Sequence, residues 1–176
     1  NGSSFEFANG WTALPDAAPF LTPRRNHSAV WTGTTMLVYG GFGFDAVSGL
    51  DDQALVDGAI YDAGLMSWSS IVVPDNLLPA RYNHTAVWTG TEMIVFGGNG
   101  AGGGVLASAA RFDPAVGWVV ANAPASDARA DHTALWFGNP VNLMVVWGGT
   151  GAGGALATGR TFNPNTAKWN AAGLPQ

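Results

Sequence analysis

The feature that most constrains the fold of this 176-residue chain is a repeat. Three segments share a pattern that runs through a histidine and a tryptophan to a closing Gly-Gly pair. They are RRNHSAVWTGTTMLVYGG (24–41), ARYNHTAVWTGTEMIVFGG (80–98) and ARADHTALWFGNPVNLMVVWGG (128–149). His27, His84 and His132 are 57 and then 48 residues apart. A period in this range indicates a repeat architecture, in which one supersecondary unit recurs and packs on its neighbours.

Each repeat continues with a second half that follows a glycine-rich stretch. These halves are 58–74, 110–124 and 160–175, and each carries an aromatic residue and then a tryptophan. Short runs of β-branched and aromatic residues, separated by Gly, Pro, Asn and Asp, are typical of strands and turns. Each repeat therefore predicts four short strands. Four-stranded repeats at this period predict an all-β fold, a β-propeller of antiparallel blades.

The repeated residues resemble the Kelch repeat, and the resemblance covers nearly the whole chain. It rests on the Gly-Gly pair that closes the second strand, the aromatic-Asp pair of the third strand and the tryptophan of the fourth. These residues are Gly40, Gly41, Gly97, Gly98, Gly148 and Gly149, with Tyr61, Asp62, Phe112 and Asp113, and Trp68, Trp118 and Trp169. The third repeat departs from the pattern, with Phe162 and Asn163 in place of Tyr and Asp. The R-x-x-H-x-A-V-W form is similar to Kelch-like arrays of secreted bacterial proteins.

The repeats divide the chain into about three and a half blades. Residues 1–23 are expected to supply the last two strands of a blade, because FEFANGWTALPDAAP (5–19) aligns with the second half of a repeat. Blades are expected at 24–79, with an insertion at 42–57, at 80–127 and at 128–176. A propeller closes with about four to eight blades, so this arc leaves apolar faces uncovered. We expect a protein partner, or further blades of a longer parent chain, to complete it.

Charge and composition exclude several classes of function. The net charge is −5, with one Lys and six Arg and no basic cluster, so binding to nucleic acid is not expected. No apolar run reaches about 18 residues, so no membrane span is expected. The chain has no Cys. Zinc sites with Cys ligands and thiol nucleophiles are therefore excluded, as is the Cys-Tyr copper site of some propeller oxidases.

The residues at the start of each repeat are the candidates for a binding site. The resemblance implies that the first strand of each blade is innermost, which places these residues at one mouth of a central channel. They are Arg25, His27, Arg81, Tyr82, His84, Arg129 and His132. One interpretation is a ring of histidines that binds a metal or does acid-base chemistry. The interpretation we favour is structural: a residue that recurs once per blade serves the blade, and each imidazole bonds to the backbone of a neighbouring blade.

The insertion at 42–57 breaks the period and is therefore not required by the fold. It carries Asp45, Asp51, Asp52 and Asp57, four of the twelve acidic residues. Three interpretations stay open: a solvated acidic loop, which we favour, a calcium site, because Ca²⁺ takes six to eight oxygen ligands, and a surface that docks a protein. The spacing is not that of an EF-hand. Calcium is the only cofactor that the sequence suggests.

The remaining repeated residues favour structural roles. The Gly-Gly pairs could suggest a phosphate cradle, but no G-x-x-x-x-G-K-S/T motif is present, and positive φ angles with close backbone approach explain them better. Trp31, Trp88 and Trp136 could stack on sugars, but their recurrence in phase favours core packing. Arg111 and Arg160 lie in third strands, where we expect them to bridge blades or hold loops.

These observations favour a non-catalytic module for protein or glycan binding, or for structural assembly. No catalytic motif stands out, and Glu occurs only as Glu6 and Glu92. The alternative is a propeller enzyme, or an accessory domain of a carbohydrate-active enzyme, with its site at the channel mouth. The resemblance and the scarcity of Lys indicate a secreted or cell-surface protein of a bacterium.

Overall fold

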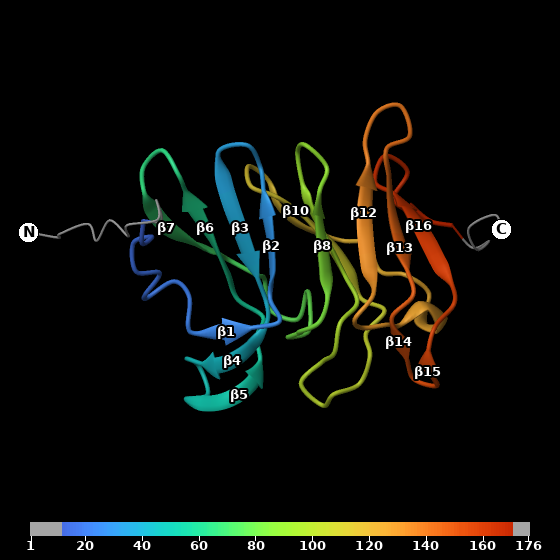
Figure 1. The fold of residues 1–176 in the computed structure, drawn as a ribbon, viewed down its shortest axis with the longest axis horizontal. Coiled ribbons are helices and arrows are strands. Elements are labelled where there is room, and N and C mark those ends of the chain that lie inside the picture. Colours follow the sequence, from blue (N-terminus) through green and yellow to red (C-terminus); the bar gives the residue numbers. More distant parts are fainter. Residues whose placement is uncertain (1–11, 171–176) are drawn as a thin grey trace, which may run out of the picture.

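The structure is a computed structural model, and it describes residues 12–170. Within that range it contains β-strands and one 3₁₀ turn, η1 (Ala125–Asp127), but no helix long and apolar enough to cross a membrane. Three four-stranded antiparallel sheets follow one another along the chain and stand side by side as an arc (Figure 1). The fold is all-β, and the predicted fold class is confirmed.

The three sheets are the blades, and each lies within one of the predicted repeats. The first blade contains β2 (Ser28–Trp31), β3 (Thr35–Tyr39), β6 (Gly58–Asp62) and β7 (Ser67–Ile71). The second contains β8 (Thr85–Trp88), β9 (Met93–Phe96), β10 (Ala109–Asp113) and β11 (Gly117–Val120). The third contains β12 (Thr133–Phe137), β13 (Leu143–Trp147), β16 (Gly159–Asn163) and β17 (Lys168–Trp169).

The hairpin that opens the first and second blades is set by its turn residues. In the second blade the N–H of Thr89 donates to the carbonyl of Glu92, and the N–H of Glu92 donates to Thr89 Oγ1. Gly90 supplies the positive φ of +109° that this tight turn needs. The resulting register places Ala86 opposite Val95 and Trp88 opposite Met93.

The blades pack face to face through two apolar clusters. One cluster joins the first and second blades and includes Leu37, Tyr39, Met93 and Val95. The other joins the second and third blades and includes Ile94, Phe96, Met144, Val146 and Phe162. The first strands β2, β8 and β12 contact one another in sequence, as expected for strands nearest a common axis. Each blade therefore has two buried faces only where it has a neighbour on both sides.

The insertion folds into a hairpin rather than the loop expected from its sequence. β4 (Phe42–Asp45) pairs with β5 (Leu50–Ala54), and β4 also pairs with β1 (Arg24–Arg25) to make a three-stranded sheet. A shorter hairpin, β14 (Thr150–Gly151) with β15 (Gly154–Ala155), occupies the corresponding place in the third blade. Both hairpins lie along the same edge of the arc, the lower edge in Figure 1.

The predicted half blade covers residues 1–23, of which 1–11 lie outside the described residues and 12–23 contain no named strand. The part that is described runs along the first blade. There the carbonyl of Pro15 accepts a hydrogen bond from Trp68 Nε1 at 3.0 Å. In the third blade Trp169 Nε1 donates in the same way to the carbonyl of Ala121 on the second blade. Residues near Pro15 therefore stand where the end of a preceding blade would stand.

Candidate functional site

The candidate site consists of the recurring residues at the start of each repeat, and a buried arginine lies at its centre. Arg81 is fully buried, and its guanidinium donates to the carbonyls of Pro79, Gly97 and Ser108 and to Ser108 Oγ, at 2.6–3.2 Å. Gly97 directly follows the second strand of the blade, and Ser108 directly precedes the third. The planar fork of Arg suits this task, because it can bond several fixed acceptors at once.

Arg129 makes the same contacts in the third blade. It is 1% exposed and donates to the carbonyls of Asp127, Gly148 and Thr158. In the first blade these contacts belong to Arg24, which donates to the carbonyls of Thr22 and Gly40 and pairs with Asp57 at 2.8 Å. The arginines thus hold the second and third strands of their own blades together.

The first-blade counterpart of Arg81 and Arg129 is Arg24 rather than Arg25. Arg25 is exposed and lies on the other side of the chain, because neighbouring residues of β1 point in opposite directions. Its guanidinium pairs with Asp52 at 2.9 Å and lies over the ring of Phe42 at 4.8 Å. Counting three residues back from each histidine gives Arg24, Arg81 and Arg129.

The histidines join neighbouring blades. His84 Nε2 is hydrogen-bonded to Ser28 Oγ of the first blade at 2.8 Å, and His132 Nε2 is hydrogen-bonded to Thr85 Oγ1 of the second blade at 2.7 Å. Ser28 and Thr85 each directly follow the histidine of their own repeat. The predicted bond from imidazole to a neighbouring blade is present, but its partner is a side-chain hydroxyl rather than the backbone.

Both bonded imidazoles are held neutral. Burial lowers the pKa of His84 to about 3, and the nearby charge of Arg81 adds to the effect. Burial, with Arg129 as the second cause, lowers the pKa of His132 to about 4. A general base needs a pKa near the working pH and access to substrate. A buried, neutral imidazole whose Nε2 is bonded to a hydroxyl has neither, so we assign these histidines a structural role.

Two backbone hydrogen bonds accompany each histidine. At the first junction the N–H of Gly41 donates to the carbonyl of Arg81, and the N–H of Asn83 donates to the carbonyl of Asn26. At the second junction Gly98 donates to Arg129, and Asp131 donates to Asn83. We call the histidine bond and these two backbone bonds together the junction triad. It occurs at both blade junctions with the same atoms at equivalent positions.

The Gly-Gly pairs are required by this junction. Gly97 has a φ of +69°, and a Cβ there would lie 2.5 Å from the carbonyl oxygen of Arg129 and 2.9 Å from His132 Cε1. Gly40 meets His84 and Arg81 in the same way. Only glycine tolerates both the positive φ and the close approach of the next blade at these positions, as the sequence indicated.

Tyr82 and His27 occupy different environments from the other members of the predicted set. Tyr82 is half-buried, and its ring contacts the ring of Phe42 at 4.7 Å, at the base of the β4–β5 hairpin. His27 is exposed, because no described strand stands before the first blade as the strands of the first blade stand before His84. The structure therefore does not bring the three histidines together, and each belongs to a separate junction.

The four carboxylates of the insertion also stay apart. Asp45 accepts from the N–H groups of Val47 and Ser48 and so caps the turn of its own hairpin, which lowers its pKa. Asp52 pairs with Arg25, and Asp57 pairs with Arg24. Asp51 is exposed. Within residues 12–170 no three acidic or histidine side chains are placed to hold a metal ion, so the calcium interpretation has no ligand cluster behind it.

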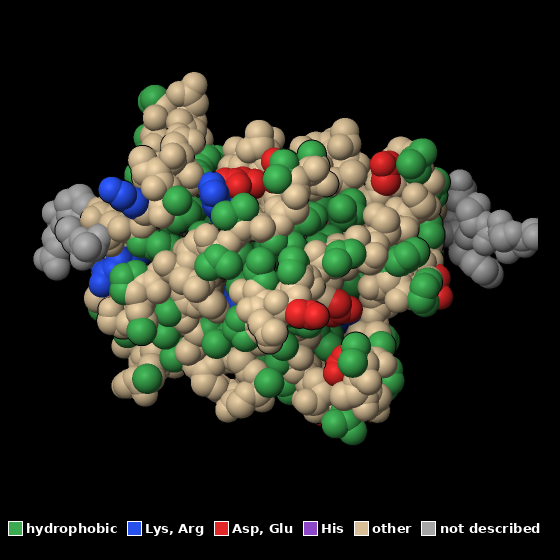
Figure 2. All heavy atoms as spheres, turned by 180° about the vertical axis from the view of Figure 1, so that it is seen from behind, with side chains coloured by type: hydrophobic (Ala, Val, Ile, Leu, Met, Phe, Trp, Pro, Cys, Tyr) green, Lys and Arg blue, Asp and Glu red, His purple; other side chains and the backbone are tan. Residues whose placement is uncertain are grey.

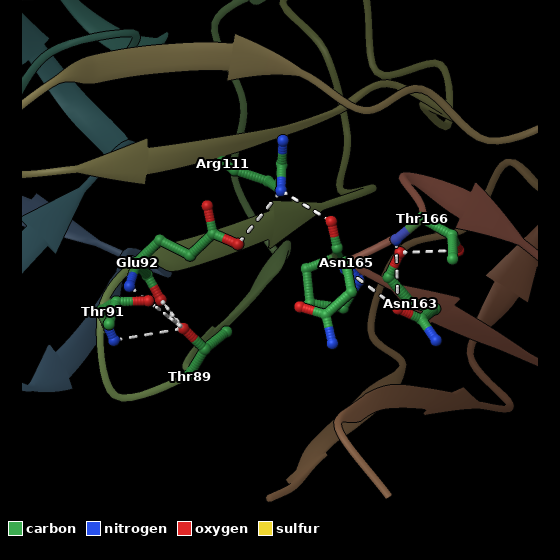
Figure 3. Close-up of polar contacts among 8 residues, drawn as sticks. Thr89, Thr91, Glu92, Arg111, Asn163, Asn165 and Thr166 are labelled. Atoms are coloured by element: carbon green, nitrogen blue, oxygen red, sulfur yellow. Dashed lines mark hydrogen bonds and ion pairs between the residues drawn. The ribbon is translucent and has the colours of Figure 1, made fainter.

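The arginines of the third strands hold loops and blades together. Arg111 of β10 lies 3.3 Å from Glu92 Oε1 and donates to the carbonyl of Pro164 on the third blade (Figure 3). Arg160 pairs at 2.8 Å with Asp127, a buried residue of the connection between the second and third blades. Sequence reasoning missed Asp127, Ser28 and Thr85. For the two hydroxyl residues a signal existed, because a Ser or Thr follows every repeat histidine.

The tryptophans of the fourth strands pack as core residues. The ring of Trp169 lies 4.6 Å from that of Phe96 across the junction and 5.0 Å from that of Phe162 in its own blade. Trp118 packs on Tyr39 and Phe112 at 5.1 and 4.9 Å. These contacts explain why the tryptophan recurs once per repeat.

Comparison with known proteins bears on the fold. No protein-family model matches the sequence, and no curated protein matches it. The chain superposes on a solved structure titled "Structure of YjhT", a Kelch-repeat propeller protein, with a TM-score of 0.70 and 17% identity. This chain has the fold of a β-propeller arc. The match covers 87% of this chain and 52% of that one, so the arc spans about half the length of the propeller that it resembles.

Proposed function

We propose that this chain is a non-catalytic part of a Kelch-type propeller that docks a protein through its β4–β5 hairpin, outside the cell or at its surface. Further blades complete the propeller, in keeping with the half-length match to a larger one. The extracellular setting rests on the similarity of the repeat to secreted bacterial arrays and on the single Lys of the chain. The hairpin carries the proposal.

The candidate residues are occupied by structural contacts, which supports a non-catalytic role. Arg81 and Arg129 are buried and donate hydrogen bonds to backbone carbonyls. One ring nitrogen of His84 and of His132 is hydrogen-bonded to a hydroxyl of the neighbouring blade. Groups engaged in this way cannot bind substrate without opening the junction. On the back of the molecule the few charged side chains are scattered rather than gathered around a hollow (Figure 2).

The hairpin combines a fixed base with an exposed apolar tip. Its base is held by the pair of Arg25 with Asp52 and by the contact of Phe42 with Tyr82. At its tip Val47 is 97% exposed and Leu50 is 57% exposed. The hairpin stands out from the arc in Figure 1. Exposed apolar side chains on a rigid support that the fold does not require are typical of protein-binding surfaces.

The same hairpin indicates how a protein would bind. β5 pairs with β4 on one side only, so its other edge presents backbone N–H and C=O groups to a partner strand. Asp51 adds an exposed carboxylate beside that edge. We therefore expect a partner that adds a strand to β5, buries Val47 and Leu50, and places a basic side chain near Asp51.

Site-specific photo-crosslinking tests this proposal. A photoreactive residue at position 47 is compared with the same residue at position 116, since Val116 is 80% exposed in the turn between β10 and β11 of the second blade. We expect one protein from the native source to crosslink at 47 and not at 116. Excess unmodified chain should compete, whereas excess Leu50→Asp chain should not. Equal crosslinking at both positions, or equal competition by both chains, would show that the hairpin is not the docking element. Competition by a free sugar would favour glycan binding instead.

A further inference from the structure

The outward face of the first blade is hollowed. A cavity of about 540 Å³ lies between residues 14–24 and the strands β2 and β3. Its apolar lining includes Leu14, Leu21, Ala29, Met36 and Val38. The cavity differs from a typical ligand pocket because its floor is a blade face, the kind of surface that is covered at both blade junctions.

The other two junctions show what covers this floor. Met93 and Val95 of the second blade correspond to Met36 and Val38, and both are fully buried under Leu37 and Tyr39 of the first blade. Met144 and Val146 of the third blade are likewise fully buried under the second blade. In both cases the covering side chains come from the second strand of the preceding blade, next to its first. The space in front of Met36 therefore corresponds to an inner pair of strands.

The outer part of the same junction is already occupied. The carbonyl of Pro15 accepts from Trp68 Nε1 as the carbonyl of Ala121 accepts from Trp169 Nε1. Residues around Pro15 thus take the place of the end of a preceding blade's fourth strand. No described strand lies in front of Ala29, Met36 and Val38, where the inner two strands of a preceding blade would lie.

Polar groups of the first blade that border the cavity indicate which hydrogen-bonding groups its occupant carries. His27 stands where His84 and His132 stand, and each of these bonds a hydroxyl on the first strand of the preceding blade. The carbonyl of Arg24 corresponds to that of Arg81, which accepts from the second glycine of a Gly-Gly pair. The N–H of Asn26 corresponds to that of Asn83, which donates to a carbonyl of the preceding blade. The first blade therefore presents its half of a junction triad.

We propose that this cavity seats a two-stranded β-hairpin of the same repeat type, with Ser or Thr at the start of its first strand and Gly-Gly after its second. The hydroxyl bonds His27, the second glycine bonds the carbonyl of Arg24, and an apolar face covers Ala29, Met36 and Val38. The inference rests on the proposal that further blades complete the arc. It does not depend on the docking role of the β4–β5 hairpin.

The test supplies such a hairpin from the chain itself. A copy of residues 80–107 is joined before residue 1, which keeps the repeat in phase because Trp11 corresponds to Trp118 in the sequence. Linkage raises the effective concentration of the hairpin at its seat. Nuclear magnetic resonance then follows the titration of His27. We expect the pKa of His27 to fall toward that of His84, about 3, and the melting temperature to rise by several degrees.

Two controls accompany this chain. In one the copied threonine that corresponds to Thr85 is replaced by Val, which keeps the apolar face and removes the hydroxyl. In the other the added segment is scrambled. We expect the valine control to seat more weakly, with a smaller change in the pKa of His27, and the scrambled control to leave His27 as it is in the unextended chain. An unchanged His27 in the extended chain, while His84 and His132 keep their low pKa values, would overturn the proposal, as would an equal change with the scrambled segment.

A second measurement covers the case in which the extended chain does not fold. The 80–107 segment is added as a free peptide to the unmodified chain, and the resonances of the Met36 methyl group and of His27 are followed. Saturable shifts of both support the seat, and no shift at millimolar peptide overturns it. Failure here would leave crosslinking at position 47 unaffected, so the two proposals can fail separately.

Discussion

His132 Nε2 lies 2.7 Å from Thr85 Oγ1, and this bond joins the third blade to the second. The same bond joins the second blade to the first, between His84 and Ser28 at 2.8 Å. The junction repeats because both residues belong to the repeat. The second blade does both: its His84 bonds the first blade, and its Thr85 bonds the third. The polar residues that looked most like a catalytic site are therefore the residues that join the blades.

Removal of the hydroxyl at the second junction should destabilise the arc. Thr85→Val leaves the buried imidazole of His132 without its partner, and we expect a loss of about 1–3 kcal/mol in the free energy of unfolding. Thr133→Val is the matched control, because Thr133 holds the same position in the third blade but is exposed. Denaturant unfolding should show almost no change for Thr133→Val. Equal losses in the two variants would mean that the hydroxyl acts within its own blade.

The junction histidines should make stability depend on pH. The folded-state pKa values of His84 and His132, about 3 and about 4, lie below the usual 6.5, so folding favours the neutral form. Their contribution is complete above pH 6.5 and is lost as the pH falls toward 3–4, by up to about 1.4 kcal/mol per pH unit for each histidine. His84→Gln cannot titrate, so its unfolding free energy, measured between pH 6 and pH 4, should fall less steeply than that of the unmodified chain. Parallel pH profiles would contradict the burial of a neutral His84.

Arg81 should be intolerant of replacement by lysine. Arg81→Lys keeps the charge but loses most of the four donor contacts to Pro79, Gly97 and Ser108, and a buried ammonium is costlier to desolvate. We expect a loss of about 2–4 kcal/mol by chemical denaturation. Arg25→Lys, at an exposed pair with Asp52, should change stability by less than about 0.5 kcal/mol. A similar cost for both would show that the buried fork is not what stabilises the blade.

The close approach of the blades can be separated from backbone strain with two glycines. Gly97 and Gly148 have the same φ, +69°, so alanine at either should cost about 1–2 kcal/mol of conformational strain. At Gly97 the added methyl also meets the carbonyl of Arg129, whereas at Gly148 the nearest atom is 3.7 Å away. Gly97→Ala should therefore lower the melting temperature more than Gly148→Ala. Equal melting temperatures for the two variants would mean that the second junction is looser than the structure indicates.

The blades were predictable because each one is specified by residues close together in the sequence. Strand alternation, the Thr-Gly turn and the Gly-Gly ending recur in phase, and each copy supports the interpretation of the others. The histidine bond was predictable in kind for the same reason, since a residue repeated once per blade has a neighbour one blade away. The hydroxyl partner could have been read from the Ser or Thr that follows each histidine.

The rest depended on which side chains meet in space. Two adjacent arginines, Arg24 and Arg25, offered equal chemistry, and only the three-residue spacing to His27 separates the buried one from the exposed one. The pairing of Asp57 with Arg24 joins residues 33 positions apart, so no local pattern indicates it. Four acids in 42–57 suggested a cluster, but Asp45, Asp52 and Asp57 have separate partners and Asp51 is exposed.

Because every junction uses the same bonds, the stability of a blade is set by how many neighbours it has. The second blade is bonded to a blade on both sides, whereas the first and third are each bonded to one other blade within the described residues. In such a linear array the ends open first, and the amide protons of β9 and β10 should be the last to exchange with solvent. Closing the ring would remove this gradient, since every blade would then have two neighbours and no blade would be an end.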